Sequence, residues 1–105
     1  MSNIHEENAK VFKALCDEKR LAILELLRDG EKCACNLTEL TGIKQTALSY
    51  HMKVLTDSKI VSATQRGKWV HYSISKAGSL EALELLTKIT TISDTNQIVD
   101  CCEDN

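Results

Sequence analysis

The stretch NLTELTGIKQTALSYHMKVLTDS, residues 36–58, decides the fold. Its first half opens with a helix-capping signature, Asn36 followed three residues later by Glu39, and stops at Gly42. Its second half predicts a longer helix from Lys44 to Ser58 with one apolar stripe. The residues expected to face the core are Leu37 and Leu40 in the short helix and Leu48, Met52 and Leu55 in the longer one. Two short helices meeting at a glycine predict a helix-turn-helix.

Two more helices are expected upstream. The first runs from about Glu6 to Leu15, and Asp17 is a predicted N-cap for a second helix that stops at Gly30. Cys16 closes the first apolar stripe and is interpreted as a core residue. The inward-facing residues of the second helix are predicted to be Leu21, Ile23, Leu24 and Leu27.

Downstream, the hydrophobic pattern changes to the period of two that is typical of strands. Ile60–Gln65 and Trp69–Ile74 are predicted strands, joined by the basic turn Arg66-Gly67-Lys68. Trp69 and Tyr72 are interpreted as anchors that pack this hairpin onto the core. The expected fold class is therefore mainly α with a small β-hairpin, a winged helix-turn-helix.

A last helix is expected from about Ser79 to Ile92, and it is apolar on several sides. The residues concerned are Leu80, Ala82, Leu83, Leu85, Leu86, Ile89 and Ile92. A chain of 105 residues has room for one small domain, which cannot cover so much apolar surface. The sequence thus predicts a homodimer, with residues 1–95 as the DNA-binding and dimerisation domain and residues 96–105 as an acidic, cysteine-containing tail.

Charge is distributed unevenly along the chain. The formal net charge is −2, yet residues 43–72 contain five cationic residues and one anionic residue. Such a basic segment is a plausible footprint for DNA phosphates, although a merely solvated face or a protein-binding winged helix would have the same composition.

The longer helix and the hairpin turn supply the candidate contacts to double-stranded operator DNA. Gln45 can pair bidentately with adenine, and serine or threonine can bond base edges or phosphates. The predicted DNA-binding residues are Lys44, Gln45, Thr46, Ser49, Tyr50, His51, Lys53, Arg66 and Lys68.

The cysteines are the most distinctive chemical feature. The first ten residues do not resemble a secretion signal and no membrane span is present, so a cytoplasmic protein with reduced thiols is expected. Cys33 and Cys35 can chelate a soft cation, but residues i and i+2 of a regular helix point about 200° apart. Ligation is therefore predicted to unwind the helix start. Cys101 and Cys102 are either additional ligands or inert tail residues.

Three segments together resemble the ArsR/SmtB family of metal-responsive bacterial repressors, and more narrowly its arsenical-responsive branch. They are FKALCDEKRLAILELL (residues 12–27), EKCACNLTELTGIKQTALSYHMKVLTDSKIV (31–61) and RGKWVHYSIS (66–75). The branch motifs correspond to Cys33-Ala34-Cys35-Asn36-Leu37 and Ser49-Tyr50-His51-Met52. The resemblance implies a dimeric repressor of a resistance operon that releases DNA when arsenite or antimonite binds, with no permanently bound cofactor.

The chain also departs from its branch. Thr38 stands where some arsenical sensors have a third cysteine, which leaves Cys101 or Cys102 as the candidate third sulfur. The zinc-sensing branch uses Asp, His and Glu ligands on its last helix, where this chain has only Glu81 and Glu84.

Other functions remain as alternatives. Within the same fold, the cysteines could respond to Cd(II), Pb(II) or Zn(II), or to oxidation. A thiol-disulfide enzyme normally has C-x-x-C within a βαβ pattern, which is absent here. No phosphate loop or hydrolase motif is present either, so the chain is not expected to be an enzyme.

Overall fold

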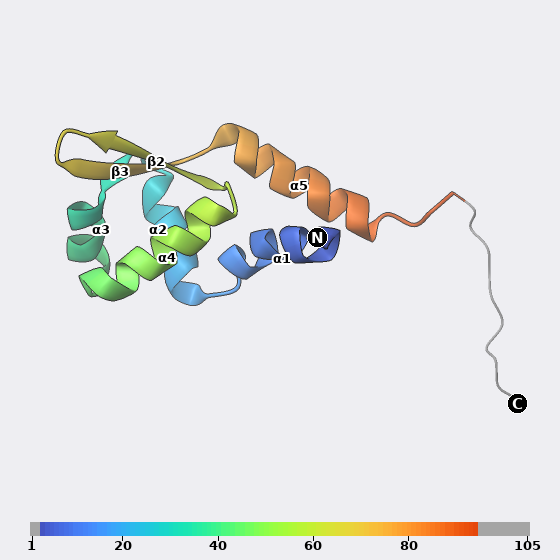
Figure 1. The fold of residues 1–105 in the computed structure, drawn as a ribbon, viewed down its shortest axis with the longest axis horizontal. Coiled ribbons are helices and arrows are strands. Elements are labelled where there is room, and N and C mark those ends of the chain that lie inside the picture. Colours follow the sequence, from blue (N-terminus) through green and yellow to red (C-terminus); the bar gives the residue numbers. More distant parts are fainter. Residues whose placement is uncertain (1–2, 95–105) are drawn as a thin grey trace, which may run out of the picture.

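A computed structural model describes residues 3–94 of the chain (Figure 1). The elements are α1 (Ile4–Leu15), α2 (Glu18–Leu27), β1 (Lys32–Cys33), α3 (Ala34–Thr41), α4 (Gln45–Asp57), β2 (Val61–Arg66), β3 (Trp69–Ile74) and α5 (Lys76–Thr90). The predicted tail 96–105, with Cys101 and Cys102, lies outside the described residues. Within residues 3–94, no helix is both long and apolar enough to span a membrane.

The wing is a three-stranded antiparallel sheet in the order β1-β3-β2. The predicted hairpin is confirmed: β2 and β3 pair from Val61 opposite Ile74 to Arg66 opposite Trp69, and Gly67 turns the chain with a positive φ of 63°. β1 was not predicted, because two residues are too few to show a period of two. It pairs with the other edge of β3, placing Cys33 opposite His71.

The core lies between α2, α3, α4 and the base of the wing. Its largest fully buried side chains are Ile23, Leu37, Leu48, Met52 and Leu55, in agreement with the predicted stripe of the longer helix. Two inward-facing predictions are wrong: Leu21 and Leu40 are 50% and 58% exposed. α2 turns Arg20, Ile23 and Leu27 to the core, and Leu21 falls off this face because it follows Arg20 by one residue.

α3 begins at Ala34, two residues before the predicted cap at Asn36. Pairing with β3 holds Cys33 in an extended conformation (φ −83°, ψ 164°), so Cys33 is the N-cap and the helix starts directly after it. The side chain of Asn36 accepts a hydrogen bond from the Cys33 backbone N–H (3.4 Å). At the other end Gly42, with φ 74°, ends α3 as predicted.

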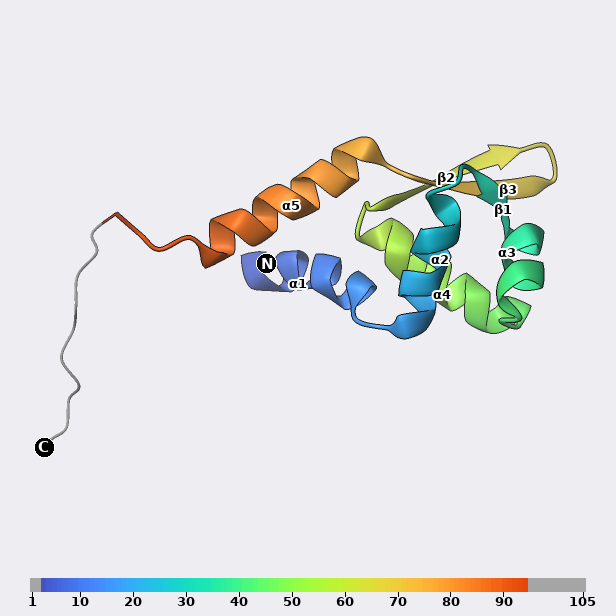
Figure 2. The same cartoon turned by 180° about the vertical axis from the view of Figure 1, so that it is seen from behind.

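α5 also begins earlier than predicted, at Lys76 and not near Ser79. The hydroxyl of Ser75 accepts the backbone N–H of Gly78 (3.0 Å) and caps the helix. A Cβ on Gly78 would lie 1.7 Å from the carbonyl oxygen of Lys59, so only glycine lets α5 approach the α4–β2 turn this closely. From there α5 runs away from the wing, on the same side of the molecule as α1 (Figures 1 and 2).

A buried arginine connects α1, α2 and α4. Arg20 is 5% exposed and donates to the carbonyl oxygens of Ala14 (3.1 Å) and Lys13 (2.9 Å) in the last turn of α1. Its Nη1 lies 3.0 Å from Nδ1 of His51 on α4. A guanidinium can only donate, so Nδ1 of His51 accepts. His51 is 8% exposed, which places it in the interior and not on the face predicted to contact DNA.

We predict that Arg20→Met lowers the free energy of unfolding by about 2–4 kcal/mol, because two carbonyl oxygens and an imidazole nitrogen lose their buried donor. Urea denaturation followed by circular dichroism measures the effect. Lys19→Met, on the exposed side of the same helix turn, is the control and should change stability by about 0.5 kcal/mol or less. Equal stability of the two variants would contradict the interpretation.

Candidate thiol site and nucleic-acid interface

The outward face of α4 carries most of the residues predicted to contact DNA. Lys44 is the N-cap of this helix, and its opposite face is buried through Leu48 and Met52. The exposed residues of the face are Gln45, Thr46, Ser49, Tyr50 and Lys53. Lys53 forms an exposed ion pair with Asp57 one turn later (3.0 Å), a weak interaction that a phosphate can replace. A polar, partly cationic face on the second helix of a helix-turn-helix suits a major groove.

The wing presents its two cations differently. Lys68 is exposed in the turn between β2 and β3. Arg66 is held by Glu31, with Nε 2.7 Å from Oε2 and Nη2 3.1 Å from Oε1. This bond raises the pKa of Arg66 and lowers the pKa of Glu31. Glu31 was missed from the sequence because its partner is 35 residues away.

The two predicted wing anchors differ from each other. Tyr72 is partly buried against the core, as predicted, and its burial raises the pKa of its hydroxyl. Trp69 is 57% exposed, so the prediction that it packs on the core is wrong. Trp69 lies at the far end of the hairpin, opposite Arg66, where the core no longer reaches.

Cys33 and Cys35 come together at the start of α3, with their sulfur atoms 2.8 Å apart. The predicted unwinding on ligation assumed that both cysteines lie in a regular helix, and this assumption is wrong. Cys33 is the extended N-cap and Cys35 lies in the first helical turn, so the 200° separation of a regular helix does not apply. Cys33 is buried and Cys35 is exposed, which gives the pair one side open to solvent.

Hydrogen bonds from Cys35 and from the backbone of Asn36 favour a thiolate at Cys33, although its thiol also lies within donating distance of Oδ1 of Asn36 (3.1 Å). The pKa of Cys33 is lowered, first by the Cys35 thiol as a hydrogen-bond donor and then by the backbone N–H of Asn36. The pKa of Cys35 is raised in turn, first through the same bond to Cys33. The lowered pKa of Cys33 and the raised pKa of Cys35 make Cys33 the more acidic thiol of the pair. A thiolate at a helix N-terminus is the form that binds soft metal ions and metalloids.

A shared ion would change this geometry. With bonds of ~2.3 Å and tetrahedral angles, as for thiolates on zinc, two sulfurs sit roughly 3.7 Å apart. They must then separate by roughly 1 Å from the 2.8 Å seen here. Within residues 3–94, no three His, Cys, Asp or Glu side chains are grouped to hold a metal ion. Cys16, predicted as core, is exposed at the end of α1.

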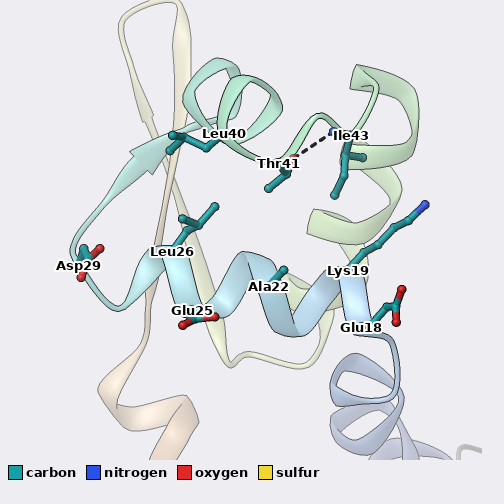
Figure 3. Close-up of a pocket in the computed structure, with 9 residues that line it drawn as sticks. All are labelled: Glu18, Lys19, Ala22, Glu25, Leu26, Asp29, Leu40, Thr41 and Ile43. Atoms are coloured by element: carbon teal, nitrogen blue, oxygen red, sulfur yellow. Dashed lines mark hydrogen bonds between the residues drawn. The ribbon is translucent and has the colours of Figure 1, made fainter.

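A separate cavity of about 610 Å³ lies between α2 and α3 (Figure 3). Leu26 and Leu40 project into it from the two helices, which explains why Leu40 is not packed in the core. It is lined by Glu18, Lys19, Ala22, Glu25, Leu26, Asp29, Leu40, Thr41 and Ile43. None of them belongs to the thiol pair or to the outward face of α4.

Comparison with known proteins agrees with this architecture. Residues 17–63 match the family model described as bacterial regulatory protein, arsR family. The arsenical resistance operon repressor of Bacillus subtilis is 43% identical over 65 residues, which cover 61% of this chain and 62% of that protein. The arsenical resistance operon repressor of Staphylococcus aureus is 37% identical over 87 residues, covering 83% and 84%.

Among solved structures, the homodimeric winged helix-turn-helix DNA-binding domain of a possible ArsR-family transcriptional regulator from Mycobacterium bovis is similar to this chain. It has a TM-score of 0.66 and 30% sequence identity, and the match covers 82% of both chains. The similarity of fold and the sequence match to the Staphylococcus aureus repressor both point to the same family. The chain therefore belongs to the ArsR family of bacterial regulatory proteins, and it is a DNA-binding regulator, not an enzyme.

Proposed function

We propose that this protein is a dimeric repressor that leaves its operator when trivalent arsenic or antimony binds Cys33 and Cys35. The observation that carries the proposal is the pair of sulfurs 2.8 Å apart at the N-terminus of α3, the first helix of the helix-turn-helix. Its relatives from Bacillus subtilis and Staphylococcus aureus are named arsenical resistance operon repressors, which supports arsenite as the inducer.

The exposed apolar side of α5 supports the homodimer. Leu80, Leu83, Leu86 and Ile89 recur every three residues and are each about half exposed or more in the single chain. Residues three apart are offset by about 60° around a helix, so this apolar surface winds around α5. Such an exposed surface is unfavourable in water and is covered by pairing with a second copy. The Mycobacterium bovis relative is homodimeric.

DNA contact is proposed for the outward face of α4 and the tip of the wing. Gln45 and Ser49 would read base edges, with Thr46 and Tyr50 beside them, while Lys44, Lys53 and Lys68 would contact phosphates. In a symmetric dimer the two α4 helices would enter successive major grooves roughly 34 Å apart, or a small multiple of that distance.

The switch follows from where the two cysteines are attached. Cys33 is held by the β1–β3 pairing, whereas Cys35 moves with α3. A ligand that moves the two sulfurs apart therefore shifts α3 relative to the wing, and α3 packs directly against α4. A ligand that favours the shifted arrangement weakens DNA binding, typically by about 5- to 150-fold.

The alternative sensors need more donors than the thiol pair provides. Zn(II) in a closed site takes four ligands, and soft divalent ions such as Cd(II) compete for the same sulfurs. Within residues 3–94, no third His, Cys, Asp or Glu side chain joins Cys33 and Cys35 in a group that could hold a metal ion. We propose Cys101 or Cys102, outside the described residues, as an auxiliary third sulfur from the same or the partner subunit.

We predict that Leu83→Glu abolishes the dimer and specific DNA binding together, because burying a carboxylate in the paired α5 surface carries a large desolvation cost. Analytical ultracentrifugation and an operator-binding assay measure the two effects. Glu84→Gln, on the same helix, is the control and should leave both unchanged. A monomeric Leu83→Glu protein that still binds the full operator tightly would refute α5 as the dimer interface.

We predict that Cys33→Ser and Cys35→Ser each keep operator binding within about twofold and lose arsenite-induced release, because one remaining sulfur cannot chelate. Fluorescence anisotropy of labelled operator during arsenite titration measures release, and Cys16→Ser is the matched control. If either variant releases DNA at the wild-type arsenite concentration, the inducer site lies elsewhere. The arsenite response of the double variant Cys101→Ser, Cys102→Ser then shows whether these two cysteines are needed for release.

We predict that alkylation by iodoacetamide is half-maximal at a lower pH for Cys33 than for a cysteine in an unstructured peptide, and at a higher pH for Cys35. A lowered pKa keeps the thiolate populated as the pH falls, whereas a raised pKa delays its appearance as the pH rises. Mass spectrometry of labelled peptides across the pH range measures both midpoints. Cys35→Ala should move the Cys33 midpoint upward, and identical midpoints in the wild type would contradict the hydrogen-bonded pair.

A further inference from the structure

Arg66 crosses the wing to reach its partner. β2, which ends at Arg66, and β1, which follows Glu31, are the two edges of the sheet, with β3 between them. The guanidinium and the carboxylate meet through two parallel bonds of 2.7 and 3.1 Å. Most exposed ion pairs contribute little, but this bidentate arrangement is the stronger and more directional kind.

The same carboxylate is connected to the thiol pair. Glu31 precedes Cys33 by two residues, and its Oε2 also lies 3.2 Å from Nδ1 of His71. His71 is the residue of β3 that faces Cys33 across the sheet. A displacement of Cys33 therefore reaches Glu31 through the backbone and through His71, and it reaches Arg66 through Glu31.

We propose that the Glu31–Arg66 pair links the Cys33–Cys35 site to the wing, and that Arg66 positions the wing instead of neutralising a DNA phosphate. The link rests on the proposed function, because arsenite is taken as the ligand of the thiols. The positioning role of Arg66 does not depend on the proposed function. We infer this role because Glu31 already neutralises the guanidinium of Arg66. Lys68, in contrast, forms no ion pair within residues 3–94 and is free to contact phosphate.

The wing contains its own reporter. Trp69 is the sole tryptophan of the chain, is 57% exposed and lies opposite Arg66 in the hairpin. Its fluorescence therefore follows the wing without DNA present. An exposed ion pair remote from the wing, the single-contact pair Glu7–Lys10 on α1 (3.2 Å), provides the control for loss of a glutamate charge.

The first experiment is an arsenite titration of the full chain, with Trp69 emission and remaining free thiols measured in parallel. We expect emission to change as thiols are consumed in the wild type and in Glu7→Gln. In Glu31→Gln and in Arg66→Gln, thiols should be consumed while the emission change is lost. The charge-reversed double variant Glu31→Arg, Arg66→Glu should regain it. An unchanged emission response in Glu31→Gln, or no response in the wild type despite thiol consumption, overturns the link.

The second experiment measures operator affinity against salt concentration without arsenite. We expect Glu31→Gln and Arg66→Gln each to weaken binding about fivefold with an unchanged salt slope, and the charge-reversed variant to recover within about twofold. A phosphate contact would instead lower the slope by about one in Arg66→Gln, and charge reversal would not rescue binding. That result overturns the positioning role.

The two experiments distinguish failure of the proposed function from failure of the Glu31–Arg66 link. If arsenite consumes no thiols in the wild type, the proposed function is wrong and the link falls with it, while the salt dependence still decides the role of Arg66. If arsenite binds and releases DNA but Trp69 responds identically in Glu31→Gln, the proposed function stands and this inference is wrong.

Discussion

The pairing of β1 with β3 is the constraint on which the functional part of the structure depends. Two residues, Lys32 and Cys33, are added to the edge of the wing, and this holds Cys33 extended at the point where α3 begins. The sulfur of Cys33 thereby meets that of Cys35, and the exposed backbone N–H groups of the helix start stabilise a thiolate. The same pairing brings Glu31 within reach of Arg66. The thiol pair and the wing thus share one short strand.

A second set of contacts joins the opposite end of the molecule to α4. Arg20 donates to the carbonyl oxygens of Ala14 and Lys13 at the end of α1 and to Nδ1 of His51, which lies beneath the exposed polar face of α4. Gly78 lets α5 start against the α4–β2 turn. The orientation of the proposed dimer helices is therefore fixed relative to α4, as a repressor that reads two half-sites requires.

These connections give α3 a central place. It contacts α4, α2 and the wing, and its first residues carry the thiol pair. The proposed release does not need the helix to unwind, because the sulfurs are already close and a small change in their separation acts on two differently anchored elements. Packed interfaces respond to such small shifts by changing between discrete arrangements, which makes them suitable for a switch.

The sequence by itself determined the helices, the hairpin and the exposed face of α4, because periodicity and glycine stops act over a few residues. Leu48, Met52 and Leu55 are buried and Gly42 turns the chain as their pattern predicts. Only the tertiary structure decided the start of α3, the interior place of His51 and the engagement of Arg66. Each depends on a partner distant in the chain, 31 residues for Arg20 and His51 and 35 for Glu31 and Arg66, and no local pattern specifies which side chains such a fold brings together.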